Sequence, residues 1–469
     1  MGQNVKLFPA LKGAFGHGEA ASASARGGLA RGLAGAALLG GLLIAGAAGA
    51  QEAAAPATTM DKGDVAWMMT STLLVLAMII PGIGLFYGGL VRAKNMLSML
   101  MQVTTCSLIG MILWAVIGYS LSFTDGPMNA FIGGFDRLFL AGITPDSEAA
   151  TFSEGVVIPE LIFVAFQMTF AALTAALVLG GTAERIKFGG VIVFSLLWPL
   201  LSYYPIAHMV WWAGGFLFDM GALDFAGGTV VHINAGVAAL VGAIVLGPRV
   251  GWKKEPMPPH SLPLTYLGAG LLWIGWFGFN AGSNLEATGG AALAIMTTLL
   301  ATAAAGLSWI VTEQITKGKP SALGLASGII AGLVAVTPAA GLIGPMGAIV
   351  LGAIASPISV VFCSSVKRAL NYDDSLDVFG IHGVCGIIGA LGTGVFTSPA
   401  LGGMGGEDFS IPGQVTTQAI AVIVAFVWSG VASFIVWYLI KMLGLLRASP
   451  DNEREGLDTA VHGEAAYHS

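Results

Sequence analysis

The sequence predicts an all-α, polytopic membrane protein with eleven transmembrane helices. Of its 469 residues, 55% are hydrophobic and only 10% are charged, whereas soluble globular domains carry about 25% charged residues. The mean hydropathy is +0.82. Apolar windows of about 20 residues, the length needed to cross a bilayer core, also recur along the chain.

Composition and charge exclude several other classes of protein. The 20 basic residues are outnumbered by 26 acidic ones, giving a net charge of −6, and nucleic acid binding needs a basic face. The three cysteines, Cys106, Cys363 and Cys385, lie singly in apolar runs. They form neither a disulfide framework nor a CxxC or CxxCH motif, and we expect no metal and no cofactor.

The first 50 residues have the parts of a secretory signal peptide. Arg26 and Arg31 precede an apolar run at 33–47, and small residues lead up to Ala50, as in cleaved leaders. We expect cleavage after Ala50, which leaves 51–64 as an exterior N-terminal segment. The alternative is an uncleaved first membrane helix.

The apolar windows make up one membrane domain at 65–446. They cover residues 65–91, 96–123, 156–181, 189–206, 222–247, 262–281, 290–316, 321–337, 341–366, 376–396 and 413–440. A lipid bilayer is therefore the expected surrounding of this domain.

Basic residues predict the direction of the helices, because loops rich in Lys and Arg stay on the cytoplasmic side. Alternate connections carry them: Arg92 and Lys94; Arg185 and Lys187; Arg249, Lys253 and Lys254; Lys317 and Lys319; Lys367 and Arg368; and Lys441, Arg447 and Arg454. The other connections hold only Arg137. The N-terminus is predicted outside and the C-terminus inside, with 447–469 as a cytoplasmic tail.

Two histidines lie inside apolar windows, where ionisable groups are costly and indicate function. His232 is in the fifth window and His382 in the tenth. Because five windows separate them, a duplication would give an inverted repeat of helices 1–5 and 6–10, with the substrate path between the halves. The alternative is that each imidazole is only a hydrogen-bonded group of the core.

An aspartate precedes each histidine: Asp224 lies before His232, and Asp377 before His382. Asp is favoured as the N-cap residue at a helix start. This is the purely structural interpretation of Asp224 and Asp377. Asp224 is also predicted to face the exterior, where its charge would attract a cation.

Two neutral imidazoles would offer a passing solute donor and acceptor nitrogens but no fixed charge. A bare cation would then face a desolvation penalty that no carboxylate offsets. This favours a solute that loses its charge by giving up a proton, which ammonium does and potassium does not. At the exterior, Trp211, Trp212 and the Ser283 hydroxyl suit a small cation; the alternative for Trp is an interfacial anchor.

Seven strings resemble bacterial members of the ammonium transporter family, which also includes the Rhesus-type proteins. They are PGIGLFYGGLVRAKN at 81–95, AFQ at 165–167, AERI at 183–186, DFAGGTVVHIN at 224–234, GWFGFNAGS at 275–283, DVFGIHGVCG at 377–386 and EREGLD at 453–458. The resemblance covers nearly all of the expected mature chain.

The resemblance implies an outer ammonium site made by Trp211, Ser283 and Phe166, with Asp224 as the aspartate that supports it. One departure is visible, because Trp211 and Trp212 stand where the family commonly has a single Trp followed by Gly. Trp211 is the choice for the site, and Trp212 the alternative.

The resemblance also implies that Phe170 and Phe279 form a stacked aromatic gate, and that His232 and His382 are the twin histidines of the pore. It implies a homotrimer with one pore per subunit. The segment 453–467 resembles a tail that receives a PII-type signal protein.

The predicted function is therefore non-enzymatic: an ammonium transporter of the inner membrane that binds the ion outside, removes a proton and passes ammonia inward. An ammonium sensor or docking platform for a PII-type protein is the first alternative. A membrane enzyme that uses the histidines for haem or metal ligation is the second.

Overall fold

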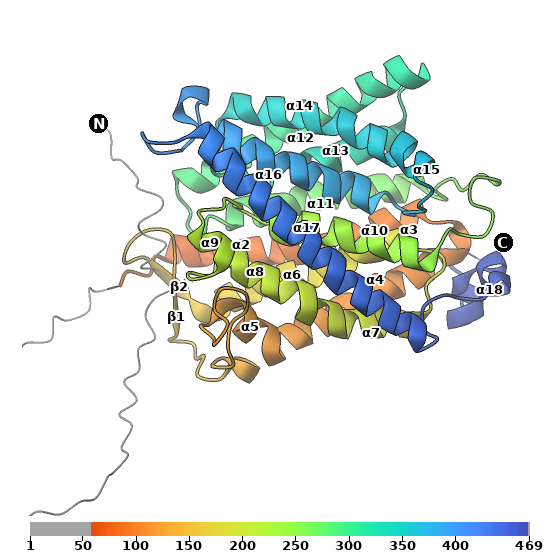
Figure 1. Ribbon diagram of the computed structural model, residues 1–469, viewed down its shortest axis with the longest axis horizontal. Coiled ribbons are helices and arrows are strands. Elements are labelled where there is room, and N and C mark those ends of the chain that lie inside the picture. Colours follow the sequence, from red (N-terminus) through yellow and green to blue (C-terminus); the bar gives the residue numbers. More distant parts are fainter. Residues whose placement is uncertain (1–57, 468–469) are drawn as a thin grey trace, which may run out of the picture.

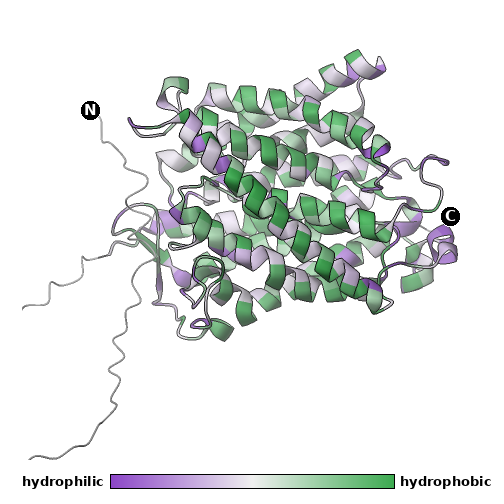
Figure 2. Cartoon of the chain, viewed as in Figure 1, coloured by the Kyte–Doolittle hydropathy of each residue, from purple (hydrophilic) through white to green (hydrophobic). Residues whose placement is uncertain are grey.

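The computed structural model describes residues 58–467, which form a bundle of roughly aligned helices (Figure 1). The predicted signal peptide and the first half of the exterior segment, 51–57, lie outside the described residues. Hydrophobic residues cover the helices, and hydrophilic ones gather in the connections at the two ends of the bundle (Figure 2). This distribution is typical of a protein surrounded by lipid.

Helices and strands of the described residues have the following bounds. The α-helices are α2 (Lys62–Ala77), α3 (Gly84–Leu90), α4 (Met96–Leu113), α5 (Tyr119–Phe123), α6 (Glu160–Thr182), α7 (Phe188–Trp198), α8 (Tyr204–Trp211), α9 (Phe216–Asp219), α10 (Asn234–Leu246), α11 (Leu262–Gly282), α12 (Gly289–Lys317), α13 (Ala322–Val336), α14 (Pro345–Val361), α15 (Lys367–Ala369), α16 (Val384–Phe396), α17 (Ile411–Met442) and α18 (Pro450–Glu455). The 3₁₀ turns are η2 (Ala93–Asn95), η4 (Leu138–Leu140) and η9 (Pro399–Leu401), and the strands are β1 (Glu148–Ala150) and β2 (Val157–Pro159).

π-helical turns join many of these α-helices into longer runs. They are η1 (Met78–Ile83), η3 (Trp114–Gly118), η5 (Pro199–Tyr203), η6 (Gly228–Ile233), η7 (Phe362–Val366), η8 (Phe379–Gly383) and η10 (Asp458–His462). Such turns are rare and frequently mark functional sites.

Within residues 58–467, ten helical runs are long and apolar enough to cross a membrane. They are Lys62–Leu90, Ala93–Phe123, Glu160–Thr182, Phe188–Asp219, Gly228–Leu246, Leu262–Gly282, Gly289–Lys317, Pro345–Ala369, Phe379–Phe396 and Ile411–Met442. The predicted window 321–337 coincides with α13, which has 15 residues and reaches only about 22 Å at 1.5 Å per residue. Eleven spans therefore stay a prediction.

The fourth run extends well beyond its predicted window, 189–206. Prolines usually interrupt helices, but Pro199 begins the π-helical turn η5 and Pro205 lies directly after it in α8, and the altered hydrogen-bond pattern of a π turn accommodates them within a continuous run. Helix α8 consequently continues to Trp211. Trp211 is therefore the last residue of a helix that continues beyond the predicted window, and its exterior position stays a prediction.

The two ends of the bundle differ (Figure 1). At one end, β1 and β2 pair in antiparallel fashion, with Ala149 opposite Ile158. The turn between them is held by Glu286, which accepts hydrogen bonds from Ser153 N at 3.0 Å and Ser153 Oγ at 2.8 Å. We call this the β end. Helix α18 lies at the opposite end, which we call the C-terminal end.

Candidate functional site

A cavity of about 730 Å³ opens into the bundle at the β end, and we call it the vestibule. Its wall includes Trp211, Ser283 and Asp224, which lie far apart in the sequence. Asp219 and Glu286 add further carboxylates, and within residues 58–467 no basic side chain is among its lining residues. An acidic, partly aromatic wall attracts small cations.

The two adjacent indoles point to different surroundings. Trp211 lines the vestibule, and its Nε1 donates to the main-chain oxygen of Asp224 at 2.9 Å. Trp212 is buried and is not part of the wall; its Nε1 donates to Asp125 Oδ1 at 2.8 Å. Of the two rings, Trp211 is therefore placed to contact a solute in the vestibule.

Ser283 and Asp224 are both fixed by local hydrogen bonds. Ser283 follows the last residue of α11, and its Oγ donates to Phe279 O at 2.8 Å. The hydroxyl proton is thereby directed at the helix, which leaves the oxygen lone pairs as acceptors. The Asp224 carboxylate accepts from the N–H groups of Gly227, Thr229 and Val230 at 3.2, 2.9 and 3.0 Å. The Asp224 carboxylate thus satisfies N–H groups at the start of η6, although the N-cap position itself is taken by Gly227.

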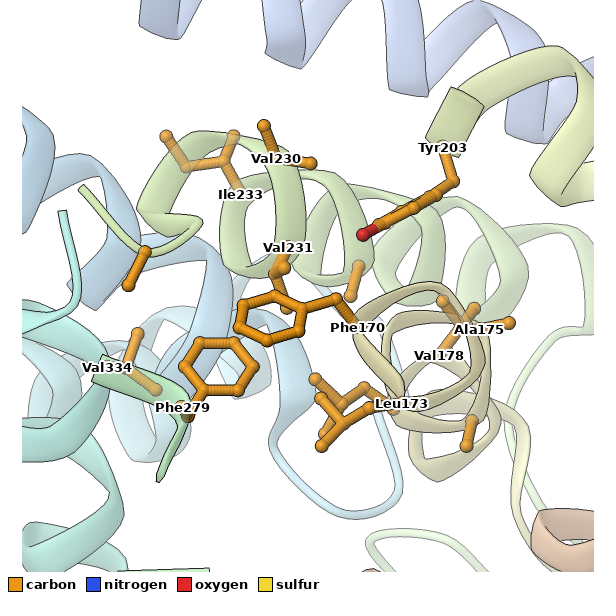
Figure 3. Close-up of a cluster of buried hydrophobic side chains, with 14 of the residues drawn as sticks. Phe170, Leu173, Ala175, Val178, Tyr203, Val230, Val231, Ile233, Phe279 and Val334 are labelled. Atoms are coloured by element: carbon orange, nitrogen blue, oxygen red, sulfur yellow. The ribbon is translucent and has the colours of Figure 1, made fainter. Parts of the chain in front are cut away.

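Two stacked phenyl rings lie next to the vestibule residue Trp211. Phe170 of α6 and Phe279 of α11 have ring centroids 4.1 Å apart and an interplanar angle of 14° (Figure 3). Both side chains are fully buried, and Phe170 also meets the Trp211 ring edge-on at 6.1 Å. Phe166 is not in the vestibule wall: it is fully buried, with its ring 4.8 Å from that of Phe170.

His232 and His382 lie together directly behind these rings. His232 is in η6 and His382 in η8, so each imidazole is carried by a π-helical turn. Their Nδ1 atoms are 3.2 Å apart, and the His232 ring centroid is 5.9 Å from that of Phe279. The His232 Nε2 atom has no hydrogen-bond partner among the described residues. The pair therefore presents imidazole nitrogen to the interior of the bundle.

Glycines bring the two histidine segments into contact. A Cβ atom on Gly236 would lie 2.3 Å from Gly383 N, so the two backbones touch at this crossing. A Cβ atom on Gly386 would lie 3.0 Å from the main-chain oxygen of Gly228. Gly236 follows His232 by four residues and Gly386 follows His382 by four, which is about one helical turn. Small residues at these positions allow the close approach.

A second, narrow cavity of about 10 Å³ lies beyond the histidines toward the C-terminal end. Leu173 and Leu177 line it, and both follow Phe170 along α6. His382 and Tyr87 also line it, and no charged side chain is among its described lining residues. Its volume is close to the least that holds one water molecule, so this cavity is narrow and mainly apolar.

The start of the second histidine segment differs from the prediction. Asp377 does not cap it: its carboxylate contacts Lys367. The capping carboxylate is that of Asp374, whose Oδ2 accepts from Phe379 N at 2.7 Å. Sequence reasoning missed Asp374, although it precedes His382 by eight residues, as Asp224 precedes His232. Equal spacing was the signal that could have identified it.

Buried ion pairs hold the C-terminal end together. Glu184 accepts hydrogen bonds from Arg92 Nε at 3.0 Å and Arg249 Nη1 at 2.8 Å, and Arg249 Nη2 is 2.9 Å from Asp373 Oδ1. Burial alone would raise the pKa of Glu184, but the Arg249 and Arg92 guanidinium groups outweigh it and lower the pKa to about 2. Arg92 and Arg249 were predicted only as charges of cytoplasmic loops.

Residues 447–467 pack against this ion-pair cluster. Arg447 Nε donates to Glu453 Oε1 at 2.7 Å, and Leu457 N donates to Asn95 Oδ1 at 2.9 Å. The Asp458 carboxylate accepts from Ser98 N at 2.7 Å, at the start of α4. The tail is therefore docked on the bundle in this structure.

Comparison with known proteins places this geometry in a family. The model of the Ammonium Transporter Family matches residues 66–467. An ammonium transporter of Aquifex aeolicus is 45% identical over 409 residues, which cover 87% of this chain and 94% of that protein. An ammonium transporter of Bacillus subtilis is 42% identical over 410 residues, covering 87% and 99%.

Solved structures agree in fold. The crystal structure of Saccharomyces cerevisiae Mep2 matches with a TM-score of 0.76 and 36% identity, covering 84% of this chain and 89% of that one. A structure titled Sensor Amt Protein matches with a TM-score of 0.77 and 30% identity, covering 85% and 98%.

Proposed function

Because the chain belongs to the ammonium transporter family, we propose that it binds the ammonium ion in the vestibule, removes a proton and conducts ammonia past the two histidines. It is a multi-pass membrane protein whose relatives carry out transport and not an enzymatic reaction. In a bacterium, such a protein belongs in the inner membrane. The observation that supports the mechanism is the buried His232 and His382 pair behind two stacked phenyl rings.

Binding of the ion is the first proposed step. The Trp211 ring, the Ser283 oxygen and the nearby Asp224 carboxylate line one cavity. A π face next to a cation contributes about 0.5 to 2 kcal/mol, and the hydroxyl oxygen accepts one N–H of the ion. Phe166 supports this site from behind, through the Phe170 ring.

Loss of the proton is the second step. Behind the Phe170 and Phe279 gate, the path meets two imidazoles and then an apolar cavity without charged lining residues in the described chain. An unpaired ion pays a large desolvation cost in such surroundings, whereas neutral ammonia pays much less. Transfer of one N–H proton to a water molecule of the open vestibule, before or at the gate, leaves ammonia as the species that passes.

We further propose eleven spans, with the N-terminus outside, the C-terminus inside and an inverted repeat of helices 1–5 and 6–10. Counting α13 as a span places His232 in the fifth helix and His382 in the tenth. Each histidine lies in a π-helical turn, eight residues after a capping aspartate. The family resemblance supports a homotrimer with one pore per subunit, which mass measurement of the solubilised complex tests.

Flux measurement on reconstituted protein tests the proposal. Proteoliposomes under an ammonium gradient should give a protein-dependent flux, and an equal potassium gradient should give none. The matched variant is Phe279→Ala, which opens the ring pair without adding charge and should keep the preference for ammonium. A potassium flux equal to the ammonium flux through the unmodified protein would contradict the proposal.

A signalling role is a second candidate, because a structure titled Sensor Amt Protein is similar over 85% of this chain. In this interpretation the docked segment 447–467 receives a PII-type protein. Truncation after Leu446 should abolish binding of a purified PII-type protein to the solubilised transporter, with Arg447→Lys as a control that keeps the segment. Unchanged binding by the truncated protein would remove this candidate.

A further inference from the structure

The vestibule is much larger than a single small ion needs. Its volume is about 730 Å³, whereas one water molecule, which is close to ammonium in size, takes up about 30 Å³ in the liquid. Pockets of about 300 to 1,000 Å³ are typical of sites for organic small molecules. An ammonium ion at Trp211 and Ser283 therefore leaves most of this space unused.

Apolar side chains form much of the vestibule wall around Trp211 and Ser283. They come from α6, α9, α12 and three connections, and they are Phe152, Phe163, Phe218, Phe225, Leu293 and Met404. Most of them are phenyl rings, which pack favourably against another aromatic ring. Because water is displaced favourably from apolar surface, this part of the wall favours an organic group over a hydrated inorganic ion.

The carboxylates of the wall are interleaved with this apolar surface. Each carboxylate residue has a sequence neighbour that is apolar and lines the same cavity. The pairs are Phe218 with Asp219, Asp224 with Phe225, and Leu285 with Glu286. A ligand with one positive end and an apolar remainder matches both parts of this wall.

Hydrogen-bond acceptors for the positive end lie where α6 and α11 touch. A Cβ atom on Gly282 would lie 3.0 Å from the Phe166 ring, and the residues that follow these two, Ser283 and Gln167, both line the vestibule. Gln167 is 8% exposed, and its Oε1 has no hydrogen-bond partner among the described residues. An amide oxygen and a hydroxyl oxygen accept N–H groups of a primary ammonium ion, R–NH₃⁺.

A bulky tail has no room to follow the ammonium group inward. Phe170 and Phe279 stack with ring centroids 4.1 Å apart beside Trp211 (Figure 3). The next cavity holds only about 10 Å³, and the backbones of Gly236 and Gly383 touch between the histidine segments. Passage of a phenyl tail would require the helices to separate, so such a ligand stays in the vestibule.

Resting on the proposed function, we propose that the vestibule binds primary organic ammonium ions with a bulky apolar tail, such as phenethylammonium, and that these ions block ammonium transport without being transported. The R–NH₃⁺ group occupies the ammonium position at Trp211, Ser283 and Gln167. The tail lies against the apolar side chains of the wall, among them Phe218. Because ammonium and the blocker share one position, inhibition is competitive.

Inhibition of ammonium flux by a matched pair of amines tests the role of the tail. Initial flux into proteoliposomes is measured with ethylammonium or phenethylammonium present. Burial of about half of the added phenyl group should lower the competitive inhibition constant by about tenfold or more. Phenethyl alcohol, which has the same tail but no charge, should inhibit more weakly by about tenfold or more. Uptake of phenethylammonium should not exceed that of protein-free liposomes.

Three variants separate the tail from the ammonium group. Phe218→Ala should raise the inhibition constant of phenethylammonium by about threefold or more relative to that of ethylammonium. Trp211→Leu should raise both constants in parallel. Phe216→Ala is the matched control, because Phe216 is 38% exposed, stacks on Phe131 and is absent from the lining residues of the described chain; it should leave the ratio of the constants unchanged.

The outcomes that contradict the inference differ from those that contradict the proposed function. Equal inhibition by the two amines, equal inhibition by phenethyl alcohol, protein-dependent uptake of phenethylammonium, or an unchanged ratio in Phe218→Ala would each overturn the inference while ammonium flux persists. Absence of any ammonium flux in the unmodified protein would instead contradict the proposed function. Calorimetric titration of the solubilised protein with phenethylammonium then measures binding without transport, and absence of binding would overturn the inference as well.

Discussion

The Nδ1 atoms of His232 and His382 lie 3.2 Å apart, which is hydrogen-bonding distance. One Nδ1 must donate and the other accept, so the two neutral rings adopt opposite tautomers. Their Nε2 atoms consequently have opposite roles, one as acceptor and one as donor. A solute such as ammonia, which both donates and accepts, matches this pair, whereas an ion that only donates does not.

Replacing His232 by Asp should turn the pore into a cation path. A fixed carboxylate behind the phenyl rings would offset part of the desolvation cost of potassium, so His232→Asp should conduct potassium and unmodified protein should not. Current recordings under potassium gradients measure this. His232→Asn, polar but uncharged, is the control and should stay closed to potassium; potassium conduction by that variant would show that size and not charge excludes the ion.

Replacing Trp211 by Leu should weaken ammonium binding without unfolding the protein. Loss of a cation–π contact of about 1 to 2 kcal/mol corresponds to a rise of about 5- to 30-fold in half-saturating concentration. Trp212→Leu should instead lower the melting temperature, because it removes a buried indole and its hydrogen bond to Asp125. If the two variants exchanged these phenotypes, the wrong ring would have been assigned to the vestibule.

Glu184 should stabilise the protein in a pH-dependent way. Its pKa is lowered from 4.5 to about 2 in the folded state, so its contribution is complete above about pH 4.5 and is lost as the pH falls toward 2. A shift of this size corresponds to about 3 kcal/mol. Glu184→Gln should therefore melt well below the unmodified protein at pH 7, and the difference should shrink on acidification.

Glu407→Gln is the control for this measurement, because Glu407 is exposed at the other end of the bundle. It should leave the melting temperature unchanged. A constant difference between Glu184→Gln and the unmodified protein from pH 7 to pH 3 would argue against the assigned ion pairs.

Gly456 should be essential for docking of the tail. Its φ is +114°, and an added Cβ would lie 2.6 Å from Lys94 Cβ, so Gly456→Ala should cost about 1 to 3 kcal/mol and release the tail. Limited proteolysis should then remove residues after 447 faster. Gly463→Ala, at φ +68° with no atom within 4 Å of the added Cβ, should release it much less; equal cleavage rates would count against the docked arrangement.

Sequence patterns predicted the helices well and the contacts between them poorly. Apolar windows and loop charges identify segments such as Gly228–Leu246, because lipid burial needs length and composition only. The extension of α8 to Trp211 could not be predicted, since the π-helical turn that accommodates Pro199 depends on packing. The placement of Phe166 behind the wall is likewise a property of side-chain packing.

The capping role of Asp374 could have been predicted from the sequence, whereas the ion pairs around Glu184 could not. Asp374 precedes His382 by eight residues, as Asp224 precedes His232, and this spacing is visible in the sequence. The helix-start role was instead predicted for Asp377, five residues before His382. Glu184, Arg249 and Asp373 come from three different connections, and no local pattern brings them together. Single-chain periodicity contains no information on such pairings.

The backbone contact between Gly236 and Gly383 fixes the distance between the two helices that carry His232 and His382. A carrier that opens first to one side and then to the other would have to pull these helices apart in every cycle. The proposed permeation requires only that side chains rotate out of the way, without the microsecond to millisecond rocking of whole domains. The transport rate is then limited by how often the Phe170 and Phe279 rings rotate aside. Mild cooling should lower this rate much less than it lowers the rate of a carrier whose domains rock.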